Sequence, residues 1–123
     1  MNNSSITIQE RSKNFAIRAI KAYSEINTKN HFNDANVVLS KQFLRSATSI
    51  GANIAEAIYA QSNKDFIAKY SIALKEASET KYWIEIMIAS NIVSATKMSL
   101  MLEEIESIIK ILTSILNKLK AKE

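Results

Sequence analysis

The chain has 123 residues, of which 47% are hydrophobic and 23% are charged, which excludes a disordered protein and fits a single folded domain over residues 1–123. One Gly and no Pro leave few residues for hairpins and tight turns, so the composition predicts an all-α fold. The absence of Cys excludes disulfides and thiolate metal sites.

The N-terminal segment and the most apolar run bear on cellular location. Residues 1–14 contain no apolar stretch followed by a small-residue cleavage site, so they do not resemble a signal peptide. The apolar run over residues 82–93 is interrupted by Glu85 and is too short to span a bilayer. We therefore expect a cytoplasmic protein with no membrane partner.

The formal net charge of +4 is distributed unevenly along the chain. Residues 1–45 hold seven Lys and Arg against three acidic residues, whereas residues 46–123 hold nine of each. The whole excess therefore falls on the first predicted helix and the start of the second. Such a basic stripe attracts phosphate, although a solvated helix face is the commoner explanation of charges at this spacing.

The first helix is predicted from about residue 7 to residue 28, because apolar residues recur there at steps of three and four. Its apolar face consists of Ile8, Phe15, Ala19, Ala22, Tyr23 and Ile26. Another face carries the basic stripe, which consists of Arg11, Asn14, Arg18, Lys21, Glu25 and Lys29. The polar residues from 28 to 36 are predicted to end this helix.

The second helix is predicted from about residue 36 to residue 59, with a polar row beside its apolar face. The apolar face consists of Phe43, Ala47, Ile50, Ile54, Ala57 and Ile58. The polar row consists of Gln42, Arg45, Ser46, Ser49, Asn53, Glu56 and Ala60. This row predicts either an ordinary wet surface or a polar interface. Arg45 and Glu56 lie about three turns apart, so each needs a partner elsewhere, for example across a subunit boundary.

The only Gly of the chain lies inside this second helix. A Gly there costs about 1 kcal/mol relative to Ala, so Gly51 is expected to have a packing role. Ala47, Gly51 and Ala55 form a row of small residues at steps of four, which allows a close approach of another helix. We expect Ala73 and Ala77 of the third helix to pack against this row.

The third helix is predicted from about residue 63 to residue 90, with Ser62 as its N-cap and Asp65 in its first turn. Its core face consists of Phe66, Tyr70, Ala73, Ala77, Ile84 and Ile88. A second stripe points away from that face and consists of Ile72, Glu76, Glu79, Trp83 and Ile86. A helix in an isolated bundle needs one apolar face, so this surplus predicts a contact with another subunit, anchored by Trp83. The alternative is a wider core within one chain.

The fourth helix is predicted from about residue 95 to residue 121. Asn91 suits the left-handed position after the third helix, and Ser94 suits the N-cap of the fourth. Apolar residues then recur in a heptad pattern from Met98 to Leu119. Four amphipathic helices with short links predict an antiparallel up-down-up-down four-helix bundle.

The residue types give no catalytic constellation. Di-iron bundles need two Glu-x-x-His motifs, whereas the only His is His31, which is predicted to lie in a loop with no Glu three residues before it. Glu76 and Glu79 share a helix face, but acids at this spacing are usually solvated or paired with cations. We therefore expect no metal, no cofactor and no enzymatic activity.

Residues 38–86 closely resemble a bacterial four-helix-bundle family, the 23S rRNA intervening-sequence proteins. The resemblance rests on the segment RSATSIGANIAEA, on KDF and on SIALKEASET. It extends to FAIRAIKAY in the first helix and LEEIESIIKIL in the fourth. The individual residues that we assign to the family motif are Arg45, Ser49, Asn53, Glu56, Asp65 and Phe66. One departure is Asn91, where relatives often have Gly.

The resemblance implies a ring-forming homo-oligomer, with a pentamer as the expected state, and no catalytic residues. A related branch, the accessory variability determinant of diversity-generating retroelements, implies RNA or DNA and a reverse transcriptase as partners. Under this hypothesis the phosphate-binding residues are Arg11, Lys13, Arg18, Lys21 and Arg45. The alternative is a structural or protein-partner module without nucleic-acid binding.

Overall fold

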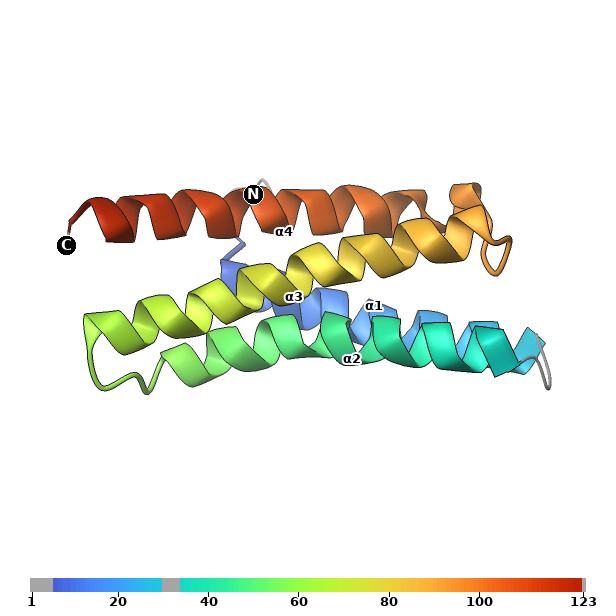
Figure 1. The fold of residues 1–123 in the computed structure, drawn as a ribbon, viewed down its shortest axis with the longest axis horizontal. Coiled ribbons are helices and arrows are strands. Elements are labelled where there is room, and N and C mark those ends of the chain that lie inside the picture. The colour runs from blue at the N-terminus through green and yellow to red at the C-terminus, as the bar shows by residue number, and fades with distance from the viewer. Residues whose placement is uncertain (1–5, 30–33, 123) are drawn as a thin grey trace.

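The computed structural model describes residues 6–29 and 34–122, which form four helices. These are α1 (Ile8–Lys29), α2 (Asp34–Ala57), α3 (Asn63–Ala89) and α4 (Ala95–Ala121). Each helix packs against its neighbours in the chain, and α4 returns to α1, as Figure 1 shows. The predicted all-α, up-down-up-down four-helix bundle is therefore confirmed. None of the four described helices combines the length and apolar character that crossing a membrane requires.

The local signals at the last two turns act as predicted. The Ser62 side chain caps α3 by accepting a hydrogen bond from the Asp65 N–H, at 3.0 Å. The Ser94 side chain caps α4 in the same way, by accepting from the Lys97 N–H at 3.1 Å. Asn91 has a φ of 63°, the left-handed conformation that Asn tolerates better than most side chains. These residues allow α3 and α4 to run antiparallel through a short link.

The second helix ends two residues earlier than predicted. After Ala57 the chain tightens, and the Ile58 N–H donates to the Ala55 carbonyl three residues back, at 3.3 Å. Ile58 is consequently 63% exposed, so the assignment of Ile58 to the core was wrong. The helical period predicts which face a residue would occupy, but Ile58 follows the last helical residue and turns away from that face.

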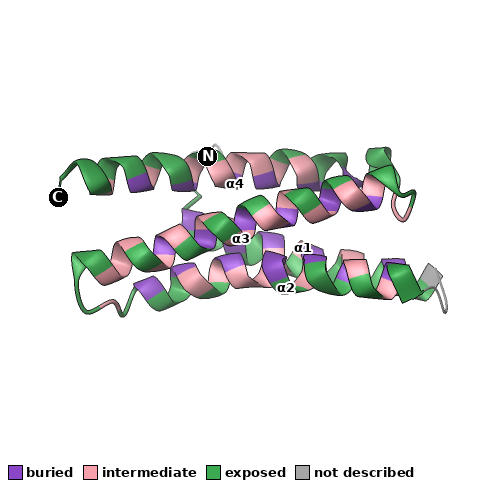
Figure 2. Cartoon of the chain, in the orientation of Figure 1, coloured by how far each residue is buried: buried purple, intermediate pink, exposed green. Residues whose placement is uncertain are grey.

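The core is a continuous apolar seam along the inner faces of all four helices (Figure 2). Its largest fully buried side chains include Phe15 of α1, Phe43 of α2 and Ile105 of α4. Ala73 and Ala77 of α3 are also fully buried, and their small size lets helix axes come close together. Burial of this apolar surface is the main force that holds the bundle together.

Gly51 has a packing role, but against a different helix from the one predicted. A Cβ added to Gly51 would lie 3.3 Å from the Ser12 Oγ of α1, and Ser12 is itself buried. The small-residue row therefore does not face α3 throughout, because a row at steps of four winds around its helix. Ala47 is buried in the core, whereas Ala55 is exposed.

Candidate functional site

A cluster of charged and polar side chains joins α2 to α3. Arg45 of α2 donates to Glu79 of α3 and also reaches Glu76, with 3.5 Å between Nη1 and Oε2. Trp83 Nε1 donates to the same Glu79 Oε2 at 3.1 Å. The partners of Arg45 therefore belong to the same chain, and a subunit boundary is not needed to supply them.

The charged cluster changes the proton affinity of its members. The pKa of Glu79 is lowered because the Trp83 N–H and the Arg45 guanidinium donate hydrogen bonds to the ionised carboxylate. Partial burial disfavours the charged form of Arg45, but the field of Glu76 and the hydrogen bond to Glu79 outweigh it, so the pKa of Arg45 is raised. Both pKa shifts favour the charged forms of Arg45 and Glu79, so the ion pair is present at neutral pH. We call the cluster of Arg45, Glu76, Glu79 and Trp83 the Arg45 clasp.

A buried hydrogen bond lies beside this clasp. Thr80 Oγ1 of α3 donates to Ser46 Oγ of α2 at 2.9 Å, or to its own Glu76 carbonyl at 2.7 Å. Ser46 and Thr80 are both fully buried. The polar row of α2 was predicted to be either a wet surface or an interface, and at Ser46 and Arg45 it is an interface between two helices of one chain.

The remaining motif residues also have structural partners. Ser49 Oγ donates to the Arg45 carbonyl at 2.6 Å, and Asn53 Nδ2 donates to the Ser49 carbonyl at 2.8 Å. Glu56, the second residue that lacked a partner in sequence, pairs with Lys69 of α3 at 3.0 Å. These bonds satisfy polar groups of α2 within the α2–α3 hairpin.

Two motif residues lie at the start of α3. The Asp65 carboxylate accepts from the Gln61 N–H at 3.3 Å and adds negative charge at the positive end of the helix dipole. The Phe66 ring stacks on Tyr70, with 4.5 Å between ring centroids, and burial raises the pKa of Tyr70. The motif residues therefore all find their partners within the α2–α3 hairpin.

The stripe predicted as a subunit interface runs along the outer side of α3. Trp83 is half-buried and packs against the core, Ile86 is half-buried, and Ile72 is 41% exposed. Glu76 Oε1 is buried and accepts no hydrogen bond from the described residues; the nearest cation, Arg45 Nη2, lies 3.5 Å away. The interface itself stays a prediction.

The five cations predicted to contact phosphate are not on one surface. Arg11 of α1 donates to both carboxylate oxygens of Glu104 on α4, at 3.0 and 2.6 Å, and this bond raises the pKa of Arg11. Arg45 belongs to the α2–α3 clasp, and Lys13 lines a hollow between α1 and α2. Of the five, only Arg18 and Lys21 line the same cavity.

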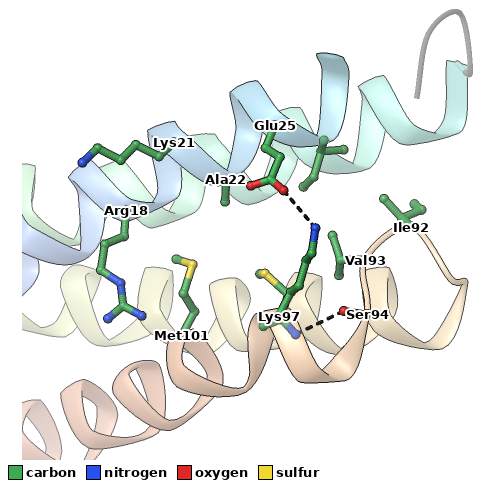
Figure 3. Close-up of a pocket in the computed structure, with 11 residues that line it drawn as sticks. Arg18, Lys21, Ala22, Glu25, Ile92, Val93, Ser94, Lys97 and Met101 are labelled. Atoms are coloured by element: carbon green, nitrogen blue, oxygen red, sulfur yellow. Dashed lines mark hydrogen bonds and ion pairs between the residues drawn. The ribbon is translucent and has the colours of Figure 1, made fainter. Parts of the chain in front are cut away.

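Arg18 and Lys21 line a cavity of about 470 Å³ between α1, the α3–α4 turn and the start of α4. Figure 3 shows Arg18 extending from α1 toward α4, and Lys97 extending from α4 toward Glu25 of α1. Within residues 6–29 and 34–122, Arg18 and Lys21 form no ion pair. Glu25 is the one carboxylate in the lining, against three cations.

Two ion pairs bracket this cavity along the α1–α4 seam. Arg11 and Glu104 close one side, and Lys97 and Glu25 close the other at 3.1 Å. The Arg11–Glu104 pair is largely covered, whereas the Lys97–Glu25 pair is more than half exposed. Lys97 was missed in the sequence because the even balance of charges after residue 45 concealed it, and only the return of α4 to α1 brings it to the basic stripe.

No reactive cluster is found within the described part of the chain. No three His, Cys, Asp or Glu side chains come together there in a way that could hold a metal ion. His31 lies outside the described residues. The polar side chains of the helices instead close seams between helices or remain on the surface, and the cavity offers charge and apolar surface. The described helices define a protein of the four-helix-bundle class.

The sequence model of the 23S rRNA-intervening sequence proteins matches residues 4–114, and the chain belongs to this family. A solved structure, that of a protein of unknown function from the S23 ribosomal protein family of Bacteroides thetaiotaomicron, is similar at 40% identity. The match covers 89% of this chain and 98% of the other, with a TM-score of 0.79. No curated protein matches the chain.

Proposed function

We propose that this protein is a non-enzymatic, ring-forming bundle that binds nucleic acid through the mouth of the α1–α4 cavity. One observation carries the proposal: Arg18, Lys21 and Lys97 line the same cavity, with Glu25 as the single carboxylate of the lining. Arg18 and Lys21 form no ion pair with the described residues, and the Lys97–Glu25 pair is exposed and contributes little stability, so these three cations can exchange counterions for phosphates. Arg11 and Arg45 are occupied by their own ion pairs, so they are not part of the proposed surface.

Assembly into a ring would compensate for the small number of cations in one chain. Two or three phosphate contacts give weak binding at physiological salt. Several linked copies act together on one polyanion, so avidity exceeds the affinity of a single site. A pentamer, the state that the family resemblance implies, would present five such groups.

The outer face of α3 supports self-assembly. Ile72 and Tyr82 of α3 are exposed large hydrophobic residues, and Trp83, which follows Tyr82 in the sequence, is half-buried. Exposed apolar side chains on the same helix are a candidate surface for contact with a second copy.

A salt titration tests nucleic-acid binding. The full chain is titrated with a structured RNA and with duplex DNA between low and high salt, beside the double variant Arg18→Glu with Lys21→Glu. We expect the plot of log affinity against log salt to become shallower by about 2 for each bound protomer on DNA, because two phosphate contacts are lost.

The matched control reverses two exposed lysines at the other end of α4, Lys118→Glu with Lys120→Glu. This variant has the same net charge as the first, so a difference between them reports position and not overall charge. Absence of binding at low salt, or equal losses in the two variants, would contradict the nucleic-acid proposal.

Light scattering tests the assembly proposal separately. We expect an oligomer at micromolar concentration that Ile72→Lys together with Tyr82→Lys dissociates, because both residues are exposed on the outer face of α3. Leu100→Lys, on α4, is the control, since Leu100 is 66% exposed and lies outside that face. A monomeric parent protein would refute ring formation.

A second function, that of a protein-partner module, is favoured by the internal pairing of Arg11 and Arg45. This pairing removes two of the five cations on which nucleic-acid binding was predicted. An oligomer that binds neither RNA nor DNA at low salt would favour this alternative.

A further inference from the structure

We propose that the α1–α4 cavity binds a small amphipathic anion, a molecule with a carboxylate or phosphate head and an aliphatic body. The cavity lies between the two ion pairs of the α1–α4 seam, where α1 and α4 pack least closely of the neighbouring helix pairs. Its volume of about 470 Å³ is within the usual range for small-molecule pockets.

The mouth of the cavity is suited to an anionic head. Arg18 and Lys21 form no ion pair with the described residues, and an Arg fork matches carboxylate and phosphate oxygens. Lys97 pairs with Glu25, but both side chains are more than half exposed, and such a pair contributes little stability. Lys97 can therefore turn from Glu25 to a bound anion at small cost.

The interior of the cavity is suited to an apolar body. Its lining there consists of Ala22, Ile26, Ile92, Val93, Met98 and Met101. Met98 and Met101 are buried beneath the cations, and Met side chains adapt to irregular ligands because they are unbranched and flexible. The small side chain of Ala22 leaves the space open on the α1 side.

Both halves of the ligand are needed to account for the cavity. An inorganic anion would pair with the cations but leave the apolar lining uncovered. An uncharged alkane-like molecule would cover the lining but leave Arg18 without an anion. An amphipathic anion matches the charge at the mouth and the apolar interior at the same time.

This inference goes beyond the proposed function, although the two share Arg18 and Lys21. Variants of the cations cannot distinguish binding of a free amphiphile from binding of a polyanion, because both ligands contact the cations. A variant of the apolar lining can distinguish them, because nucleic-acid phosphates would contact the mouth of the cavity and not its interior. Ala22→Leu narrows the apolar interior and leaves every cation in place.

Methyl NMR of the full chain tests the inference with octanoate and octyl phosphate as probes. We expect saturable shifts of the Met98 and Met101 methyl signals and no shift of Ile108, which is fully buried in the core. Acetate, inorganic phosphate and octanol are the comparison probes. Acetate and inorganic phosphate carry only the anionic head, and octanol carries only the aliphatic body. We expect each to bind at least about tenfold more weakly than octanoate, because one charge-assisted hydrogen bond or at least two buried methylenes are lost.

Variants then assign the two halves of the site. Arg18→Gln is expected to weaken octanoate binding about tenfold, the effect of one charge-assisted hydrogen bond. Ala22→Leu is expected to weaken it by at least the same factor while leaving salt-dependent nucleic-acid binding unchanged. Lys13→Gln, on the same helix but outside the cavity, is expected to have no effect.

Several results would overturn the inference. Equal binding of acetate and octanoate would indicate surface cations only, and equal binding of octanol would indicate apolar association only. Unchanged octanoate binding by Ala22→Leu would place the probe outside the cavity. Binding to phosphatidylglycerol vesicles without binding of free octanoate or octyl phosphate would indicate a membrane-surface interaction instead.

Discussion

The α2–α3 seam and the α1–α4 seam are built from different residues and serve different ends. Small side chains line the first, and a buried Ser46–Thr80 hydrogen bond and the Arg45 clasp cross it. The second has one covered and one exposed ion pair, and a cavity lies between them. The first seam satisfies its own polar groups, whereas the second leaves cations and apolar surface available to a ligand.

This difference separates the family motif from the candidate binding site. Arg45, Ser49, Asn53, Glu56 and Asp65 all bond within the α2–α3 hairpin. The family motif in this chain therefore marks the α2–α3 half of the bundle. The proposed binding site is marked by Arg18 and Lys21, which form no ion pair with the described residues and belong to no contiguous motif.

The largest expected effect comes from placing the same larger side chain in each seam. Ala77→Leu is expected to destabilise the protein by about 3 kcal/mol, which is the upper end of the usual cost of overpacking, because Ala77 is fully buried. Ala22→Leu is expected to be neutral or slightly stabilising, since it fills existing space. Urea denaturation measures both, and equal destabilisation would mean that the two seams are equally tight.

A smaller effect is expected from the buried hydrogen bond. Thr80→Val removes the Thr80 hydroxyl, so the buried Ser46 hydroxyl loses its hydrogen-bond donor. We expect this loss to lower the free energy of unfolding by about 2 kcal/mol. The double variant with Ser46→Ala is expected to recover part of this loss, because neither buried hydroxyl remains. A double-mutant cycle by urea denaturation gives the coupling free energy between Ser46 and Thr80. Additive losses would show that their hydrogen bond does not contribute to stability.

A still smaller effect on stability is expected from breaking either ion pair of the α1–α4 seam. Glu104→Gln is expected to cost about 1 kcal/mol, because the Arg11–Glu104 pair is bidentate and mostly covered. Glu25→Gln is expected to change stability by less than about 0.5 kcal/mol, because its pair with Lys97 is exposed. Urea denaturation at low and high salt measures both. Equal costs would show that the covered Arg11–Glu104 pair is no more stabilising than the exposed Lys97–Glu25 pair.

The smallest expected effect is on the pH dependence of the clasp. The lowered pKa of Glu79 gives stability that is complete above the ordinary Glu pKa of about 4.3 and is lost as the pH falls through the lowered value. Trp83→Phe removes the hydrogen-bond donor, so the pKa of Glu79 should rise and the loss of stability with acid should become shallower.

Carboxyl NMR of Glu79 and urea denaturation at several pH values measure this change. Tyr82→Phe is the control, because Tyr82 contacts Trp83 only through ring edges and donates no hydrogen bond to Glu79. An unchanged Glu79 titration in Trp83→Phe would show that Trp83 does not determine this pKa.

Much of the fold could be predicted because its signals are local. Apolar spacing located all four helices, and Ser62, Asn91 and Ser94 marked the turns correctly. The failures involve contacts between helices. Ile58 was placed in the core because its helix was expected to continue, and Gly51 was assigned to α3 although it packs on Ser12 of α1.

The candidate site could be predicted only in part. Arg18 and Lys21 were recognised as cations on one stripe, and the structure keeps them together. Lys97 was missed, and Arg11 and Arg45 were grouped with the phosphate-binding residues although both are paired within the chain. A count of charges along the chain does not show which charges meet across it.

By itself, the sequence determined the helices, their caps and the family, because these depend on neighbouring residues and on spacing along one helix. Only the tertiary structure decided which cations are neutralised and which remain available. Arg11 meets a carboxylate 93 residues away and Arg45 meets one 34 residues away, and the packing of the helices alone brings them within bonding distance.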